Sequence, residues 1–351
     1  MKLMASAKSV LFGITAAATL ALGPVQAQEE HSYILATAST GGTYYPVGVA
    51  LATLTKVKLQ PTDKIDMSAI NSAGSGENVR LLRENEAQFA ILQGLFGYYA
   101  RTGTGPVEAD GPQDKLRSIS MLWQNVEQFV LDSDLAKTGT IEDFVNAKGE
   151  TVALGKKNSG TIGSNRTILG NLGVDIDTDY TLIYGGYGPS ASAIQDGKAV
   201  GMSTPAGVPT GAVTKLMASN DGVTLLSFSP EQAKQADGEL NLWTPYLIPA
   251  GTYPGQDADV QTIAQPNFLA VRDDVPEEDV YKITKTIYEN LAFLQAIHKA
   301  TTAMALDKAI AGLPVPLHPK KFRKRGFNQS FLLVRDWANT ADALNIRGLS
   351  F

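Results

Sequence analysis

The sequence predicts an α/β protein of two lobes, each with a mainly parallel sheet flanked by helices. Three observations predict this class. The chain has 351 residues, enough for about two domains of roughly 100–200 residues each. Short β-rich runs alternate with longer amphipathic runs in the order β-α-β-α-β, which is typical of a parallel sheet with helices on both faces. This order occurs twice, once before about residue 122 and once after it.

The first lobe is predicted from residues 28–122. β-branched and aromatic residues gather in short runs that end at glycine-containing breaks, and a longer amphipathic run follows each of the first two breaks. We expect strands at 33–38, 65–70, 89–92 and 116–123, and helices at about 45–54 and 75–83.

The second lobe is predicted from residues 123–249. We expect its strands at 128–132, 151–154, 179–184 and 199–204, and its helices at 141–145, 164–172 and 190–196. A long helical segment at 280–296 then returns the chain, with Ile283, Ile287, Leu291 and Leu294 spaced for one buried face. We therefore assign residues 250–319 to lobe one as well.

Charge is distributed unevenly along the chain, whose formal net charge is −5. Residues 1–27 carry Lys2, Lys8 and no acid, then an apolar run and small residues up to Ala27, which is typical of a secretory signal peptide cleaved after Ala27. The alternative is a membrane anchor, but the apolar run is short for a span of about 20 residues. Residues 320–351 carry +5, which leaves −12 for residues 28–319. We expect a periplasmic protein with an acidic body and a basic tail.

Four glycine-rich turns fall where a predicted strand ends and a helix begins. They are residues 39–45 (STGGTYY), 71–78 (NSAGSGEN), 158–164 (NSGTIGS) and 184–190 (YGGYGPS). In an open parallel sheet, ligands bind at the carboxyl ends of the strands. Glycine lets a ligand approach the backbone, and the free N–H groups and dipole of a helix start favour an anion. Any one of these turns is more often only a turn or a helix cap, but together the four predict an anion-binding cleft between the lobes.

Composition and motifs exclude several classes of catalytic site. The chain has no cysteine and 3 His, so thiolate chemistry is excluded and a His-built metal centre is disfavoured. It contains no Walker phosphate loop, no spaced G-x-G-x-x-G and no G-x-S-x-G elbow. We expect no catalytic residue, no metal and no cofactor.

Six short motifs follow one another along the chain. They are residues 41–48 (GGTYYPVG), 72–78 (SAGSGEN) with 81–82 (LL), 159–161 (SGT), 206–212 (AGVPTGA), 253–256 (YPGQ) and 312–319 (GLPVPLHP). In this order they resemble the TAXI family of TRAP-transporter-associated extracytoplasmic receptors, over about residues 31–319. The resemblance implies a two-lobed periplasmic-binding-protein fold with a hinge between the lobes. It also implies a small organic anion as ligand, a carboxylate such as an amino acid or a dicarboxylate, and TRAP membrane permease subunits as partners.

The resemblance further implies which residues contact the ligand. From lobe one they are Gly42, Thr43, Tyr44, Ser72, Gly74, Ser75, Asn78 and Gln93. From lobe two they are Ser159, Gly160, Thr161, Ser164, Gly207 and Pro209. The chain departs from the family pattern after Gln93, where an acidic residue is common, and at Val208, where a polar residue is common, which indicates a changed pocket polarity.

Other side chains are weaker candidates. Tyr98, Tyr99, Trp123 and Tyr187 are candidates for stacking on a ligand, although an aromatic residue near a strand end is more often core. Arg80 and Arg166 follow glycine turns and would suit a bidentate pair with a carboxylate, although helix surfaces are rich in solvated arginine. Asn125 and Gln128 lie near the predicted crossover between the lobes.

The end of the chain departs from the TAXI pattern. Residues 314–343 resemble a fragment of competence-protein-F-type phosphoribosyltransferases, with PLHP followed by a basic run and RGFNQ. The acidic loop of those enzymes, two neighbouring Asp followed by Thr-Thr-Gly, is absent from the sequence. The alternative function is therefore an enzyme, a phosphoribosyltransferase-related fusion or fragment, or a hydrolase that uses the cleft. Our main interpretation is a monomeric solute receptor that is not an enzyme and binds no nucleic acid.

Overall fold

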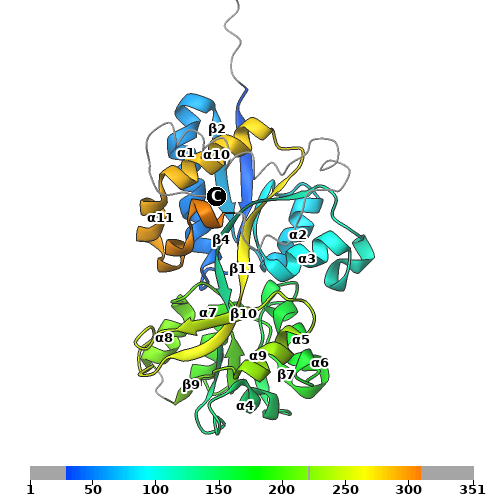
Figure 1. Cartoon of the computed structure of the whole chain (residues 1–351), viewed down its shortest axis with the longest axis vertical. Helices are drawn as coiled ribbons and strands as arrows, with labels where there is room; N and C mark the ends of the chain where they lie inside the picture. Colours follow the sequence, from blue (N-terminus) through cyan, green and yellow to red (C-terminus); the bar gives the residue numbers. More distant parts are fainter. Residues whose placement is uncertain (1–28, 220–221, 310–351) are drawn as a thin grey trace, which may run out of the picture.

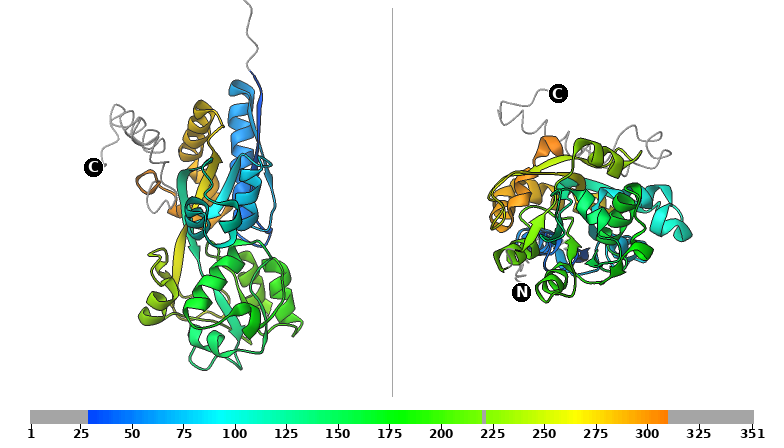
Figure 2. Two further views of the ribbon diagram at one scale, coloured as in Figure 1. Left: turned by 90° about the vertical axis from the view of Figure 1, so that its right-hand side faces the viewer. Right: turned by 90° about the horizontal axis from the view of Figure 1, so that it is seen from below.

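The computed structural model describes residues 29–219 and 222–309. The predicted signal peptide 1–27, the motif at 312–319 and the basic tail 320–351 with its phosphoribosyltransferase-like segment lie outside the described residues. The described chain forms two lobes stacked along the long axis of the molecule (Figure 1), and they stay distinct when it is turned by 90° (Figure 2). Each lobe holds one sheet flanked by helices, which confirms the predicted α/β class.

Lobe one contains a 6-stranded sheet in the order β10-β11-β3-β1-β2, with β4 also paired to β11. Its parallel part has β1 (His31–Ala36) between β2 (Ile65–Ile70) and β3 (Phe89–Gln93). β11 (Val260–Arg272) runs antiparallel to β3, and β4 (Leu116–Val126) and β10 (Thr244–Ile248) each pair antiparallel with β11. The helices are α1 (Tyr44–Asp63), α2 (Ser75–Arg83), α3 (Gly94–Thr102), α10 (Glu277–Glu289) and α11 (Leu291–Ile297), with short 3₁₀ turns η1 (Gly105–Asp110), η2 (Lys299–Ala303) and η3 (Leu306–Lys308).

Lobe two contains a 5-stranded sheet in the order β7-β6-β8-β5-β9. Its parallel part has β6 (Thr151–Ala153) between β7 (Thr181–Leu182) and β8 (Gly201–Ser203), and β5 (Phe129–Asp132) runs antiparallel between β8 and β9 (Val223–Leu225). The helices around it are α4 (Ile141–Asn146), α5 (Gly160–Asn171), α6 (Ile176–Asp179), α7 (Tyr187–Gln195), α8 (Gly211–Ser219) and α9 (Pro230–Asp237).

The sheets contain more antiparallel pairs than the β-α-β pattern alone indicates. The chain passes between the lobes along extended segments, because β4 leads almost directly into β5 and β11 runs from beside lobe two into the sheet of lobe one (Figure 1). β11 reaches the sheet of lobe one from lobe two and runs antiparallel to β3. β5 reaches the sheet of lobe two from lobe one and runs antiparallel to β8. The predicted boundary near residue 123 falls inside β4, and the one near residue 250 falls between β10 and β11.

The predicted long helix at 280–296 is two helices that meet at Asn290. The backbone of Asn290 leaves helical geometry, with φ −126° and ψ 31°, and its side-chain Nδ2 donates to the carbonyl of Thr286 over 2.8 Å. An asparagine that bonds to its own helix in this way competes with the backbone ladder. None of the helices within the described ranges has the length and apolar character that a membrane span requires.

Each lobe buries its own hydrophobic core. In lobe one, Val47 and Leu51 of α1 pack with Leu35 and Phe89 of the sheet. In lobe two, Phe144 meets the ring of Phe129 edge to face, with ring centroids 5.2 Å apart. Because each sheet is covered separately, the carboxyl ends of the parallel strands are left to face one another between the lobes.

Candidate functional site

A cavity lies between the lobes, at the carboxyl ends of the parallel strands of both sheets. The segments after β1, β2 and β3 form its lobe-one wall, and the segments after β6, β7 and β8 form its lobe-two wall. Its volume is about 30 Å³, and the empty space is about 450 Å³ when the mouth open to solvent is included. The space suits a small solute better than a polymer. We refer to it as the interlobe cavity.

Four helices begin at the wall of the interlobe cavity. They are α1, α2, α5 and α7, whose first residues or N-caps line it. The first amides of a helix have no acceptor inside that helix, and its dipole places partial positive charge there. The wall therefore presents N–H donors and positive potential from both lobes, which is a chemical match for an anion.

All four predicted glycine-rich turns contribute to this wall. The strand and helix patterns are local, so they place each turn correctly, and the parallel pairing then gathers the turns at one edge of each sheet. Nine of the fourteen predicted ligand contacts line the interlobe cavity: Gly42, Thr43, Tyr44, Gly74, Ser75, Gln93, Ser159, Gly160 and Thr161.

Ser72 and Asn78 lie behind the wall of the interlobe cavity rather than on it. The Asn78 amide donates to the carbonyls of Thr37 over 2.7 Å and Ile91 over 2.9 Å, and the Ser72 hydroxyl donates to the Asn78 Oδ1 over 2.6 Å. Both side chains are buried. These bonds tie the start of α2 to the ends of β1 and β3, so Ser72 and Asn78 position the second turn.

Ser164, Gly207 and Pro209 also lie outside the cavity lining. Ser164 accepts bonds from the side chains of Gln93 and Gln265, each over 3.0 Å. The carbonyl of Gly207 accepts a bond from the Thr43 hydroxyl over 3.0 Å. Pro209 follows a cis peptide bond in the same loop. The first two residues thus connect the lobes directly.

Glycines at the helix starts allow the lobes to approach closely. A Cβ added to Gly160 would lie 2.6 Å from Gln93 Oε1, and one added to Gly76 would lie 2.5 Å from the carbonyl oxygen of Asn158. Across the same contact, the amide of Glu77 donates to that carbonyl over 2.8 Å. The lobes are thus closed on one another in this structure, and part of the glycine content serves this contact rather than a ligand.

Lys156 lines the wall and is not among the predicted ligand contacts. It follows β6 and lies two residues before the turn at 158–164, so its place after a strand end is the signal in the sequence that points to it. Ser39 of the first turn also lines the wall. A Cβ added to Gly186 would lie 3.4 Å from Lys156 Cε and 3.5 Å from Ser39 Oγ, so these two side chains are neighbours across the cavity.

The weaker candidates divide between wall, core and surface. Tyr187 and Asn125 line the interlobe cavity, whereas Trp123 is core and packs edge to face on Tyr44. The hydroxyl of Tyr187 donates to the carbonyl of Pro205 over 2.7 Å. Burial raises the pKa of Tyr187, so its hydroxyl stays protonated at neutral pH.

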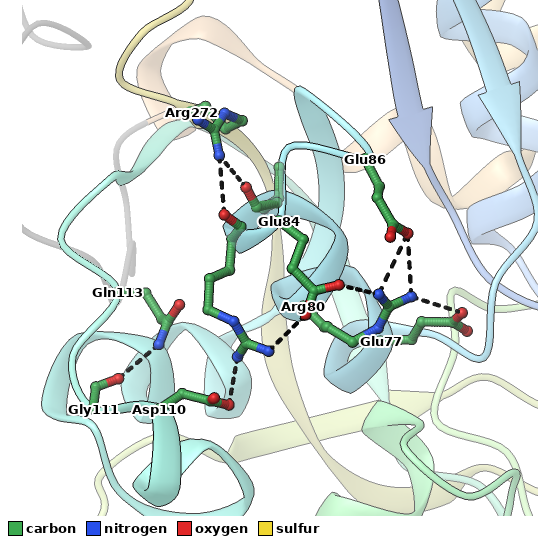
Figure 3. Close-up of polar contacts among 10 residues, drawn as sticks. Glu77, Arg80, Glu84, Glu86, Asp110, Gly111, Gln113 and Arg272 are labelled. Atoms are coloured by element: carbon green, nitrogen blue, oxygen red, sulfur yellow. Dashed lines mark hydrogen bonds and ion pairs between the residues drawn. The ribbon is translucent and has the colours of Figure 1, made fainter.

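The two candidate arginines are paired on the surface. Arg80 lies among the carboxylates of Glu77, Glu84 and Glu86 (Figure 3), and pairs with the last at 3.3 Å. Arg166 makes a bidentate pair with Asp177, with N···O distances of 3.0 and 2.7 Å. Neither lines the interlobe cavity.

A buried carboxyl group, Glu127, lies at the β4–β5 crossing between the lobes. Its Oε1 accepts from Trp243 Nε1 over 2.9 Å and from Gln265 Nε2 over 3.4 Å, while Oε2 has no hydrogen-bond partner among the described residues. Burial raises the pKa of Glu127 to about 7, because its effect is larger than that of the hydrogen bonds, which lower the pKa. Within the described ranges, His, Asp and Glu side chains nowhere form a group that would hold a metal ion.

Comparison with known proteins gives one family and a set of distant structural neighbours. The NMT1-like family matches residues 35–323. The alkanesulfonate-binding protein SsuA from Xanthomonas axonopodis pv. citri, bound to MOPS, is 10% identical, covers 77% of this chain and 80% of its own, and has a TM-score of 0.44. The periplasmic aliphatic sulphonate binding protein SsuA from Escherichia coli is 13% identical, and the match covers 88% of this chain and 84% of that protein, with a TM-score of 0.44. The periplasmic binding protein BugD is 14% identical, and the match covers 90% of this chain and 98% of that protein, with a TM-score of 0.49.

Proposed function

Because this chain belongs to the NMT1-like family, we propose that it is an extracytoplasmic solute-binding receptor. It captures a small organic anion, a carboxylate such as an amino acid or a dicarboxylate, between its two lobes. It then delivers the ligand to the permease subunits of a TRAP transporter, as a TAXI-type receptor would. The six ordered motifs in residues 41–319 support this type of transporter.

The observation that carries the proposal is the convergence of four helix N-termini on one cavity between two lobes. A body of charge −12 repels an anion at long range, so local donors have to supply the attraction. Backbone amides and hydroxyls from both lobes meet that need. Thr43 and Ser75 contribute hydroxyls from lobe one, and Thr161 contributes one from lobe two.

The proposed mechanism is closure of the lobes around the ligand. A ligand that accepts hydrogen bonds from both walls binds the closed arrangement best and therefore favours it. Gln93 already joins the two walls, because its side chain lines the cavity and donates to Gly160 of the other lobe. The two passages of chain at β4–β5 and β10–β11 are the proposed hinge, with lobe one at 28–122 and 250–319 and lobe two at 123–249.

A receptor function is favoured over an enzyme by the composition of the cavity wall. Its described residues include no Asp, Glu or His, and so offer no carboxylate or imidazole as a general base. The phosphoribosyltransferase-like segment lies outside the described residues and lacks the acidic loop of those enzymes. We therefore propose a periplasmic monomer with no catalytic activity, released from its signal peptide after Ala27.

Thermal melting of the full mature chain tests this function. The panel contains monocarboxylates, dicarboxylates, amino acids and sugar phosphates, and a ligand that binds only the folded state raises the melting temperature. We expect one class of small anion to raise it without being consumed. Consumption of a phosphoribosyl or ester substrate, with no shift by any anion, would overturn the receptor proposal. A chain truncated after Pro319 is the control for the tail, and we expect it to bind as the full chain does.

A further inference from the structure

The charge at the wall of the interlobe cavity restricts which small organic anions the cavity can hold. Of the nineteen described residues that line it, Lys156 alone is charged. The side chain is half-buried, and among the described residues its ammonium has no carboxylate within ion-pair distance. Because the Lys156 ammonium has no carboxylate partner in the described part of the chain, it can pair with one negatively charged group of a ligand.

The acidic residues near the cavity do not change this balance. Glu77 accepts a bond from the amide of Ala73 over 2.6 Å and pairs with Arg80. Glu127 is buried behind the wall and bonded to Trp243 and Gln265. Neither lines the cavity, so an ammonium group on a ligand would find no carboxylate there.

We propose that the receptor selects a small monocarboxylate that carries no cationic group, and that Lys156 is the residue that recognises its charge. This rests on the proposed receptor function and keeps its carboxylate class, but it replaces the amino acid and the dicarboxylate given there as examples. A second carboxylate on the ligand would be closed into the cavity without a counter-ion, and an ammonium would face helix N-termini of its own sign. The charges of dicarboxylates and zwitterionic amino acids therefore exclude them.

The position of Lys156 gives it a second role in closure. The Lys156 Cε and the Ser39 hydroxyl both lie close to the position that a Cβ on Gly186 would occupy. Lys156 belongs to lobe two and Ser39 to lobe one. The Ser39 hydroxyl, like the Lys156 ammonium, has no side-chain partner among the described residues. A carboxylate between them has two oxygens and accepts from both, so the ligand charge joins the lobes at the cavity mouth.

Two sets of ligands matched in size and differing in charge test the proposal. The three-carbon set is lactate, alanine, malonate and lactamide, and the four-carbon set is 2-hydroxybutanoate, 2-aminobutanoate, succinate and 2-hydroxybutanamide. Binding to the full mature chain is measured by calorimetry at neutral pH. We expect a monoanion to bind at least about tenfold more tightly than the other three members of its set, because its charge-assisted hydrogen bonds are not made by a neutral or mismatched ligand.

Substitutions at Lys156 separate charge recognition from folding. Lys156→Gln should weaken binding of the monoanion about tenfold or more and remove its advantage over the neutral amide, whereas Lys156→Arg should keep that advantage. The matched control is Lys157→Gln, since the Lys157 ammonium lies 4.9 Å from the Tyr184 ring centroid and does not line the cavity. All three variants should melt as the parent does without ligand.

Each outcome is decisive. Tighter binding of alanine, malonate or their homologues than of the monoanions would overturn the selectivity while leaving the receptor function in place. So would a Lys156→Gln variant that still prefers the monoanion over the amide. If no anion of the broad panel binds, the receptor function itself fails.

Discussion

Gln93 of lobe one donates through Nε2 to the carbonyl of Gly160 of lobe two over 3.0 Å. Both residues line the interlobe cavity, so part of its wall is a direct contact between the lobes. The same amide nitrogen donates to Ser164 over 3.0 Å, and Gln93 Oε1 accepts from Asn125 over 3.2 Å. The side chain is only 2% exposed. Its hydrogen bonds therefore stabilise the closed arrangement in a dry environment, where a lost partner is costly.

Replacing Gln93 should shift the free receptor towards an open arrangement. Gln93→Leu keeps the approximate volume but removes the bond to the Gly160 carbonyl and leaves the Asn125 amide without its partner. An unpaired buried group costs about 1–3 kcal/mol. Opening the cleft hydrates the Asn125 amide, so the open form should gain. Small-angle X-ray scattering should give a larger radius of gyration than for the parent chain. The control is Gln195→Leu on the surface of α7, and identical scattering from the Gln93 variant would contradict the prediction.

A methyl group at Gly76 should prevent full closure more than it weakens the fold. Gly76 lies in α2, where alanine is favoured over glycine by about 1 kcal/mol. The added Cβ would lie 2.5 Å from the Asn158 carbonyl oxygen of the other lobe and 3.1 Å from Phe96 Cε1 of its own lobe. The helix preference offsets the tight contact with Phe96, whereas the contact with Asn158 is relieved only by opening. Gly76→Ala should therefore lower ligand affinity while the free energy of unfolding in the absence of ligand stays within about 1 kcal/mol of the parent.

A second helical glycine provides the control for this substitution. Gly170 lies in α5, and a Cβ added there meets nothing within 4 Å. Gly170→Ala should raise the free energy of unfolding by up to about 1 kcal/mol and leave affinity unchanged. Equal affinities of the two variants would mean that the contact at Gly76 has no part in closure.

The sequence predicts the parts of this site that depend on local pattern. A strand, a glycine-rich turn and a helix can each be read from neighbouring residues, and this placed Thr43, Ser75 and Gly160 at the wall. Asn78 also lies in such a turn, but its side chain bonds to the carbonyls of Thr37 and Ile91. Those partners are distant in sequence, so the positioning role was not predictable from the pattern.

Two other features depended on contacts that no local pattern contains. The antiparallel pairing of β11 with β3 and β4 arises because the chain crosses between the lobes, and the pairing of Ala270 with Ala90 joins residues far apart in sequence. Glu127 looks like an ordinary charged residue in the sequence, and only the packing of Trp243 and Gln265 around it shows that it is buried. Lys156 is different, because its place after β6 follows from the local strand pattern.

The hydroxyl of Ser159 should contribute to the stability of the free protein. It caps α5 by accepting from the amide of Ile162 over 3.1 Å, and donates to the carbonyl of Lys156 over 2.7 Å. Loss of such a cap costs about 1 kcal/mol. Chemical denaturation of Ser159→Ala without ligand should give that loss, whereas Ser39→Ala, whose hydroxyl bonds no described side chain, should stay within about 0.5 kcal/mol of the parent. A Ser159 variant as stable as the Ser39 variant would restrict Ser159 to ligand binding.

Glu127 should make the stability of the protein fall as the pH rises from about 4.5 to about 7. Burial raises the pKa of its carboxyl group from 4.5 to about 7 in the folded state. Between these values the folded chain binds more protons than the unfolded chain, so the free energy of unfolding decreases with pH and levels off above the folded pKa. The difference between the two pKa values corresponds to about 3 kcal/mol.

Glu127→Gln isolates this contribution from other titrating groups. The amide oxygen still accepts from Trp243 Nε1, and the group no longer ionises. The free energy of unfolding, measured by denaturant titration from pH 4.5 to 8, should fall less steeply for the variant than for the parent. The gap between them should grow by about 3 kcal/mol across that window, because only the parent buries a charge at the upper end. Parallel curves would mean that Glu127 ionises as easily in the folded chain as in the unfolded one.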